Sequence, residues 1–350
     1  MHRFPAPALE GFAQRLLQAY GSAPEEAAIV ARHLVLANLS GHDSHGVHLL
    51  SMYAQWLQAG ITRPNTAVTL TEDAGAILRF DGGFGFGQRV ALEATEIAAE
   101  RARRTGVTLW TLGNAMHVGR IGHYGEWLVE RGLAGLFFVN VTAHGPSVAP
   151  HGGRDARLLT NPVCIAVPGD PPFVLDMATS QIALGKVNVA NAKGAPLAIG
   201  LGIDAAGEET TDPAAVLDGG ALLPAGLHKG YGLAVACEIL AGIVGGGGTL
   251  APHHPRDGSS RNALFAVTFL PERLGDPAEQ RRELEALRAY LTASPPRREG
   301  EPVQLAGDPE RAARAERQAM GLEIPPATVE TLLEVAREAG LAGAGLAPLG

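Results

Sequence analysis

The stretch LGNAMHVGRIGHYG (112–125) joins an expected strand to an expected helix and gives the first indication of the fold class. The apolar run VTLWTL (107–112) precedes it, and the helical pattern EWLVERG follows it. Glycines let the backbone turn sharply and approach a ligand closely. His117 can exchange a proton near neutral pH, and Arg120 can bind a carboxylate or phosphate through two hydrogen bonds. The stretch is therefore either a functional junction or an ordinary surface loop, and the rest of the chain favours a functional junction.

The composition is typical of a globular protein with a substantial core. The chain has 350 residues, so we expect two closely associated domains or one large, elaborated domain. A net charge of −8 argues against nucleic acid or an anionic membrane as the main partner. Cys164 and Cys237 lie in apolar stretches and cannot form a disulfide framework. With neither a leader pattern nor a membrane-spanning run, the sequence predicts a cytoplasmic protein.

Helical patterns open the chain. Ser22 followed by Glu25 fits a capping box for a helix that continues to Ala37. A second helix is expected over 47–59, with Gly60 as its stop. Its core-facing stripe consists of Val47, Leu50, Tyr53 and Leu57.

Between these helices, GHDSHGVH (41–48) places His42, His45 and His48 three residues apart. Histidines at this spacing are only approximately aligned on a helix, and a metal site would need carboxylate or cysteine partners. We therefore favour a polar helix-entry turn, capped by Asp43 or Ser44, over a metal site.

The middle of the chain mixes strand and helix patterns. Buried strands are expected within 133–141, 163–168 and 172–180 and over 263–270, because these runs are short, apolar and rich in β-branched or aromatic residues. Asp176 lies where the apolar part of 172–180 meets a turn of small residues, and there it could accept hydrogen bonds from a ribose or cap the next helix. Together the patterns predict a mixed sheet flanked by helices.

A glycine-rich segment, ILRFDGGFGFGQ (77–88), superficially resembles a dinucleotide-binding fingerprint. Its glycines, at 83, 85 and 87, give GxGxG instead of GxGxxG. We therefore interpret the segment as a turn with packed aromatic residues and expect a fold other than the Rossmann fold.

LLPAGLHKGYGLAVACEILAGIVGG (222–246) predicts a turn followed by a long, buried apolar helix from about Tyr231. Lys229 at the helix entrance could bind an anion or be a solvated turn residue. It is one of only three lysines, at 186, 193 and 229, against 25 arginines.

Helical patterns also close the chain. One covers 308–321, with Asp308 as N-cap and Gly321 as stop, and the last ends at Gly340. We expect three parts: a helical N-terminal part (1–70), a mixed-sheet domain for catalysis and ligand binding (71–275), and a helical C-terminal part (276–350) packing with the N-terminal part.

Nine motifs in order along the chain resemble those of the type-2 malate/L-lactate dehydrogenase family, closest to its hydroxycarboxylate dehydrogenase B branch. They are GHDSHG at 41, FGQ at 86, GNAMHVGRIGHYGEW at 113, VAPHGG at 148, TNP at 160, LDMATS at 175, GK at 185, HKGYGL at 228 and ERQAMG at 316. The resemblance extends over about 26–340 and is far more specific than a single glycine loop.

The resemblance implies a homodimeric oxidoreductase that uses NAD or NADP to interconvert a 2-hydroxy acid and a 2-oxo acid. It implies that His45 and His117 match the histidines that act as proton donor or acceptor, and we favour His117 for proton transfer, with His45 bound to the substrate or sharing that role. Arg120 and Lys229 are our further candidate catalytic residues. The resemblance implies cofactor contacts at His45, Gly119, Arg120, Ile121, Val174, Leu175, Asp176, Met177, Ala178, His228, Lys229, Asn262, Gly307, Asp308, Pro309 and Glu310. No metal is implied.

The chain departs from the family pattern at Leu49, where many members have an arginine thought to hold the substrate carboxylate. An apolar side chain there favours a substrate with an apolar or aryl group over a dicarboxylate. Arg120 then becomes the expected carboxylate or phosphate partner. Alternatives are a malate/lactate-type or imino-acid reductase of the same family, a metal-dependent hydrolase, and a non-catalytic binding protein.

Overall fold

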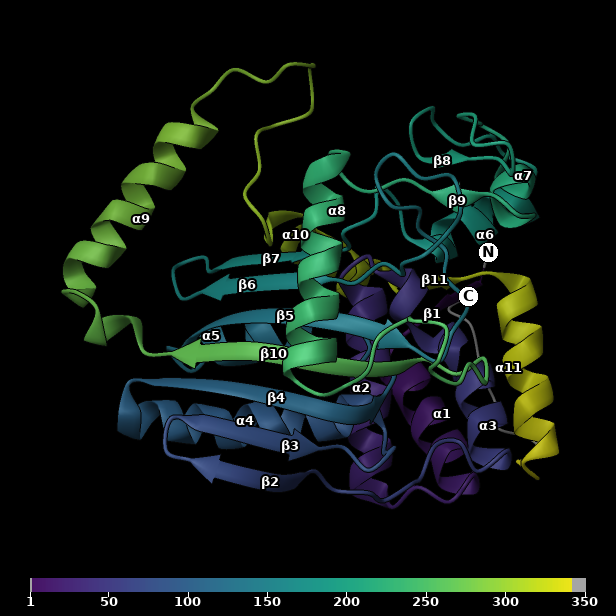
Figure 1. Cartoon of the computed structure of the whole chain (residues 1–350), viewed down its shortest axis with the longest axis horizontal. Coiled ribbons are helices and arrows are strands. Elements are labelled where there is room, and N and C mark those ends of the chain that lie inside the picture. Colours follow the sequence, from purple (N-terminus) through teal and green to yellow (C-terminus); the bar gives the residue numbers. More distant parts are fainter. Residues whose placement is uncertain (1, 342–350) are drawn as a thin grey trace.

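A seven-stranded mixed sheet lies at the centre of the protein (Figure 1). The computed structural model describes residues 2–341. The strand order is β2-β3-β4-β10-β5-β6-β7, with β3 and β4 parallel and the other neighbours antiparallel. This confirms the expected mixed α/β class. The strands are β2 (Thr69–Ala74), β3 (Ile77–Asp81), β4 (Val107–Met116), β5 (Ala134–Thr142), β6 (Val163–Val167), β7 (Phe173–Met177) and β10 (Arg261–Phe269).

Two helices, α4 (Gly87–Thr105) and α5 (Gly122–Val129), pack on one face of the sheet. The buried stripe of α4 consists largely of alanines, whose small side chains let the helix approach the strands closely. In the core between these helices and the sheet, the rings of Trp110 and Phe137 pack edge to face, with their centroids 5.9 Å apart.

β4 is four residues longer than the sequence predicted, because Asn114 adopts a left-handed conformation, with φ of 51°, and pairing with β10 continues to Met116. The connection to α5 is therefore only five residues long, 117–121. It holds His117, Gly119 and Arg120 close to the sheet edge.

The N-terminal helices form a second layer with its own apolar core. α10 lies against α2, and α11 lies against α3. The elements of this layer are β1 (His2–Phe4), α1 (Ala6–Ala19), α2 (Pro24–Leu39), α3 (Leu50–Gln58), α10 (Asp308–Met320), β11 (Leu322–Ile324) and α11 (Pro326–Glu338). Two caps were predicted wrongly: α2 begins at Pro24 while Ser22 donates to Glu26 instead, and Gly307, not Asp308, caps α10.

The expected C-terminal part needs correction at α9 (Pro277–Thr292). This helix projects from the opposite side of the sheet from α1, α3 and α11 (Figure 1). Its Leu284 reaches Gly169, in the β6–β7 connection. Only the segment from α10 onward packs with the N-terminal helices, and 342–350 lie outside the described residues.

The region predicted as one domain, 71–275, contains a second, smaller lobe with a separate apolar core. Val148, Val187, Val216 and Leu222 are buried there. The lobe is built from α6 (Leu184–Ala192), β8 (Gly202–Ile203), α7 (Pro213–Leu217) and β9 (Ala221–Leu222).

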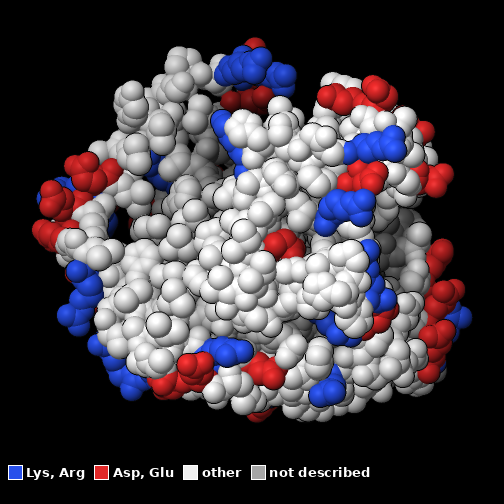
Figure 2. Space-filling model, viewed as in Figure 1, with Lys and Arg blue, Asp and Glu red and all other residues white. Residues whose placement is uncertain are grey.

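α8 (His228–Cys237) crosses the face of the sheet opposite α4 and continues as a π-helix, Glu238–Val244 (Figure 1). The prediction that it is a buried helix was wrong. Cys237 and Ala241 face the sheet, whereas Ile243 and Val244 are 64% and 65% exposed. The molecular face that includes α8 is largely uncharged (Figure 2). Within residues 2–341, every helix is too short or too polar to span a bilayer.

Candidate active site

Two histidines from distant parts of the chain stack against each other beside the edge of the sheet. His45 ends a short 3-10 turn, Asp43–His45, between α2 and α3, and His117 directly follows β4. Their ring centroids are 5.6 Å apart and their planes differ by 20°. Both side chains are only partly buried. The two rings are therefore packed against each other and still have a face that a ligand can reach.

Each histidine has one ring nitrogen occupied by a neighbour. Ser44 Oγ lies 3.0 Å from His45 Nδ1. The Tyr53 hydroxyl lies 2.7 Å from His117 Nδ1. In both rings Nε2 is the nitrogen left for a ligand.

The environment disfavours a positive charge on either ring. Burial, followed by the nearby His117, lowers the pKa of His45 to about 3. Burial, followed by His48, lowers the pKa of His117 to about 4. Both rings are therefore neutral at pH 7 in the free protein, and protonation of one disfavours protonation of the other.

Arg120 is buried in a network of charges and does not face the histidine pair. Its guanidinium donates to both carboxylate oxygens of Glu126, at 2.5 and 3.1 Å, and Nε lies 3.3 Å from Asp176 Oδ2. Arg314 from α10 pairs with the same Glu126. The geometry therefore does not support the prediction that Arg120 binds the substrate carboxylate, because two carboxylates already surround its charge.

Three of the expected cofactor-contacting segments do come together around this network. The Gly122 amide, next to the 119–121 segment, donates to Asp176 of β7 at 2.9 Å. The Val174 amide donates to Ala306, just before Gly307 and α10, at 3.3 Å. The strand β7, the β4–α5 connection and the start of α10 thus adjoin one another and form one surface region. The expected positions Gly119, Arg120, Ile121, Val174 and Gly307 are buried beneath it, and the others within 174–178 and 307–310 are partly or fully exposed.

Glu310 belongs to the same surface and connects it to the N-terminal helices. Its carboxylate lies 3.1 Å from His42 Nε2. Arg317, two turns further along α10, binds Asp43 through both carboxylate oxygens. The start of α10 is therefore tied to the same turn that carries His45.

His228 and Lys229 lie on the exposed first turn of α8. The ring of His228 is 5.9 Å from that of His151 in the smaller lobe. The preceding Leu227 has a backbone φ of 58°, which residues other than glycine rarely adopt. The two residues are thus presented to solvent at the junction between the sheet and the smaller lobe.

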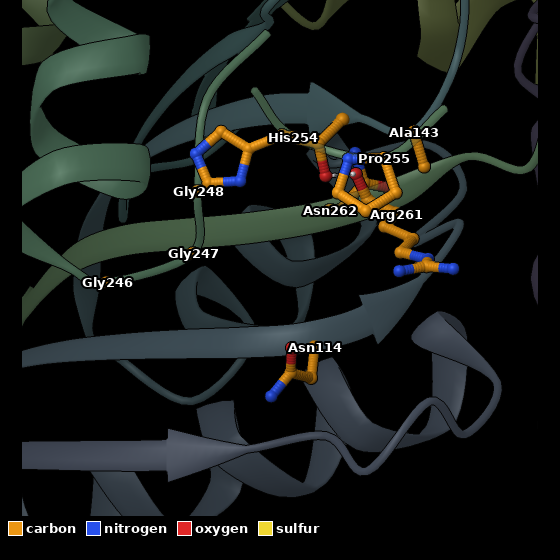
Figure 3. Close-up of a pocket in the computed structure, with 10 residues that line it drawn as sticks. Asn114, Ala143, Gly246, Gly247, Gly248, His254, Pro255, Arg261 and Asn262 are labelled. Carbon is orange, nitrogen blue, oxygen red and sulfur yellow. Dashed lines mark hydrogen bonds between the residues drawn. The ribbon is translucent and has the colours of Figure 1, made fainter. Parts of the chain in front are cut away.

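Asn262 lines a polar cavity of about 270 Å³ at the ends of β4, β5 and β10 (Figure 3). Arg261, His254 and the glycine turn 246–248 also line it. The Asn262 side chain accepts from the Val118 amide at 2.9 Å and donates to the Asn140 carbonyl at 3.0 Å. Asn262 therefore connects this cavity to the backbone next to His117.

The three histidines of 41–48 have separate surroundings: His42 pairs with Glu310, His45 stacks on His117, and His48 is exposed. Within the described part of the chain, no group of three or more histidine, cysteine or acidic side chains is arranged to hold a metal ion. Leu49, the departure from the family pattern, packs against the N-terminal apolar core.

Sequence reasoning missed the roles of Tyr53 and Gln88 beside His117, and of Lys186, whose neighbour Gly185 lies against Ser44. Tyr53 was placed on the core stripe of its helix, which is correct for its ring but not for its hydroxyl. Gln88 is fully buried and donates to that hydroxyl at 2.6 Å. Lys186 is exposed on the first turn of α6, next to Gly185, whose Cα faces Ser44. The scarcity of lysine and the GK motif were the available signals for Lys186.

Known proteins resemble the chain over nearly its whole length. The family model described as malate/L-lactate dehydrogenase matches residues 4–333. Hydroxycarboxylate dehydrogenase B of Escherichia coli is 37% identical over 97% of this chain and 95% of its own length. L-lactate dehydrogenase of Cupriavidus necator is 42% identical over 89% of this chain and 91% of its own. The structure of a putative malate/lactate dehydrogenase from E. coli superimposes with a TM-score of 0.93 at 37% identity, covering 97% and 96% of the two chains. On this evidence the chain belongs to the malate/L-lactate dehydrogenase family.

Proposed function

We propose that this protein interconverts a 2-hydroxy acid with an apolar or aryl side chain and the corresponding 2-oxo acid, using NAD or NADP and histidine acid/base catalysis. Family membership makes it a 2-hydroxycarboxylate dehydrogenase that uses a nicotinamide cofactor. The observation that carries the proposal for the site is the stacked pair of partly exposed histidines, His45 and His117.

The role of transferring the substrate proton is assigned to His117. A bound nicotinamide accepts or supplies the hydride at its C4. His117 Nε2 then takes the hydroxyl proton in the oxidative direction and returns it in the reductive direction. Its Nδ1 faces Tyr53, so the ring is fixed in orientation. His45 Nε2 is assigned a hydrogen bond to the same substrate oxygen, because the two rings stack face to face.

Lys186 is proposed as the cation for the substrate carboxylate. Arg120 is surrounded by Glu126 and Asp176, and Leu49 offers no polar group. The first turn of α6 lies against Ser44, the neighbour of His45. A flexible ammonium group at that position can approach a carboxylate near the histidine pair.

The cofactor is assigned to the surface formed by β7, the β4–α5 connection and the start of α10, with Asn262 beside it. The exposure of this region supports the fit: Asp176, Met177 and Ala178 at the end of β7 are only partly buried, and Pro309 at the start of α10 is exposed. Gly119 and Gly307, with φ of 72° and 95°, let His33 and Arg311 pack directly against the backbone there. Lys229 is proposed as a phosphate partner at the start of α8. Asp176 already accepts a hydrogen bond from the Gly122 amide and pairs with Arg120. It therefore gives no reason to prefer one cofactor, and the proposal includes both NAD and NADP.

A homodimer is proposed, with the exposed apolar side of α8 and the following π-helix as the contact. Four large side chains lie exposed on it: Leu233, Ile239, Ile243 and Val244. No charged residue lies within 239–246. Large uncharged surfaces of this kind are typical of interfaces between subunits. Cytoplasmic location remains part of the proposal.

The test is a substrate panel assayed by nicotinamide absorbance with NADH and NADPH separately. We expect turnover of alkyl and aryl 2-oxo acids, and at least tenfold lower kcat/KM for a dicarboxylic 2-oxo acid. A cyclic imino acid and a chelator test the other enzyme classes. Absence of turnover with every 2-oxo acid would refute the proposal.

The three lysines allow a matched comparison. Lys186→Met should raise the KM for the 2-oxo acid at least tenfold, because it removes the carboxylate partner. Lys229→Met should raise the KM for the cofactor instead. Lys193→Met, at the far end of α6, should leave both constants unchanged. If Lys186→Met behaves like Lys193→Met, the carboxylate partner lies elsewhere.

A further inference from the structure

A buried chain of hydrogen bonds connects His117 to the interior. The Tyr53 hydroxyl lies 2.7 Å from His117 Nδ1, and Gln88 Nε2 donates to the same hydroxyl at 2.6 Å. Tyr53 is 1% exposed and Gln88 is fully buried. Gln88 Oε1 is buried and has no hydrogen-bond partner within the described part of the chain. Tyr53 and Gln88 are therefore isolated from water with few alternative partners, and the Nδ1 side of His117 faces them.

The hydrogens in this chain have two complete arrangements, because a tyrosine hydroxyl has one proton to donate. In the first, Gln88 Nε2 donates to Tyr53, and Tyr53 donates to His117 Nδ1. Neutral His117 then carries its proton on Nε2. In the second, the Gln88 amide is turned by 180°, Tyr53 donates to Gln88 Oε1, and His117 Nδ1 donates to Tyr53. Neutral His117 then has a free electron pair on Nε2.

Only the second arrangement supports acid/base chemistry at Nε2. A base must present an electron pair to the substrate hydroxyl, and the first arrangement places a hydrogen there. A proton donor must be the imidazolium, whose Nδ1 also carries a hydrogen and needs an acceptor. Tyr53 accepts that hydrogen only while its own proton points to Gln88.

We propose that Tyr53 and Gln88 are positioning residues that select the tautomer of His117, and that the active enzyme has Gln88 Oε1 facing Tyr53. This inference rests on the proposed role of His117. In oxidation, the substrate O–H proton moves to His117 Nε2, while the hydride leaves the adjacent carbon for the cofactor. The hydrogens on Nδ1 and Tyr53 remain where they were. In reduction, the same proton returns from Nε2 to the new alkoxide, and the chain is again unchanged.

Four variants test the proposal. Tyr53→Phe removes the hydroxyl but keeps the ring, and Gln88→Met removes the amide at similar volume. Gln88→Glu, when ionised, can only accept from Tyr53, and therefore enforces the second arrangement. Tyr290→Phe, at a 78% exposed position on α9, is the matched control.

The main readout is the imidazole nitrogen chemical shifts of His117, assigned by comparison with His117→Asn. We expect the Nδ1–H tautomer in the wild-type protein at pH 8, and also in Gln88→Glu and Tyr290→Phe. Tyr53→Phe and Gln88→Met should lose this preference. Their kcat should fall at least tenfold with less than threefold change in KM. Gln88→Glu should stay within threefold of wild-type kcat, and the acid limb of its oxidative pH profile should move to higher pH.

The inference is overturned if wild-type His117 carries its proton on Nε2, or if Gln88→Glu and Gln88→Met have the same tautomer and pH profile. If Tyr53→Phe does not fold, the comparison of the two Gln88 variants decides. A wild-type protein without turnover on any 2-oxo acid would refute the proposed function, but the nitrogen shifts would still report the tautomer. An active wild-type enzyme with unaffected variants would refute this inference alone.

Discussion

Replacing Glu126 with glutamine should destabilise the protein by about 3 kcal/mol at pH 7. Burial opposes the charge of Glu126, but Arg120 and Arg314 overcome it and lower the carboxyl pKa to about 2, from an ordinary value of 4.5. Each pKa unit between the folded and unfolded states corresponds to about 1.4 kcal/mol, which gives the expected loss. Glu126→Gln keeps the side-chain volume but leaves the buried Arg120 with Asp176 as its only nearby carboxylate in the network.

The assay is urea unfolding of both proteins at pH 7, 5, 4 and 3. Because the pKa of Glu126 is lowered on folding, its stabilisation is complete above about pH 5 and is lost as the pH falls from 4.5 towards 2. The difference between wild type and Glu126→Gln should therefore shrink on acidification. The control is Glu301→Gln, an exposed carboxylate 3.6 Å from Arg298, which should cost less than about 0.5 kcal/mol. Equal effects of the two substitutions, or a difference independent of pH, would refute the reasoning.

Three further predictions follow from other features of the fold. The pKa values of about 3 for His45 and about 4 for His117 keep both rings neutral in mild acid. The kcat/KM for oxidation of a 2-hydroxy acid should therefore stay level from neutral pH down to about pH 5. A decline in kcat/KM centred near pH 6.5 would contradict this. Ala143 has φ of 66°, and Ala143→Gly should raise the free energy of unfolding by about 1 kcal/mol in urea titrations, whereas a loss would show that the side chain matters more. Ile243→Glu should convert a dimer to monomers, as measured by light scattering. Ile199→Glu, at a 65% exposed position on the smaller lobe, should leave the dimer intact. If both variants remain dimers, the subunit contact lies elsewhere.

Short apolar runs with clear boundaries predicted the strands well. The runs at 133–141, 163–168 and 263–270 correspond to β5, β6 and β10 within two residues at either end. Their side chains are buried by the sheet itself, so the local pattern carries the information. Helix α1 had no predicted counterpart, although Leu9, Phe12 and Leu16 follow helical spacing and are buried.

Predictions that depended on long-range packing were less accurate. α8 was expected to be buried because its sequence is apolar throughout, but the sheet covers only the side that carries Ala234 and Cys237. Nothing in a local pattern shows how much of a helix the rest of the chain covers. For the same reason the smaller lobe around Val187 was not separated from the main sheet.

In the active site, too, the sequence did not show the contacts that depend on long-range packing. The pairing of His45 with His117 was suggested by family resemblance and not by spacing, because 71 residues separate them. Arg120 was expected to be free for a ligand, but it pairs with Glu126 in the following helix and with Asp176. Asp176 comes from β7, so that contact depends on long-range packing. The hydroxyl of Tyr53 could not be interpreted from its helical stripe, because its partner, Gln88, belongs to another helix.

The ion pairs made by α10 determine when two parts of the site can be joined during synthesis on the ribosome. Arg314 binds Glu126 just beyond the β4–α5 connection, and Arg317 binds Asp43 in the turn that carries His45. The two halves of the histidine site emerge early, but the helix that holds both appears only after residue 308. A nascent chain therefore contains both histidines before the ion pairs of α10 with Glu126 and Asp43 can form.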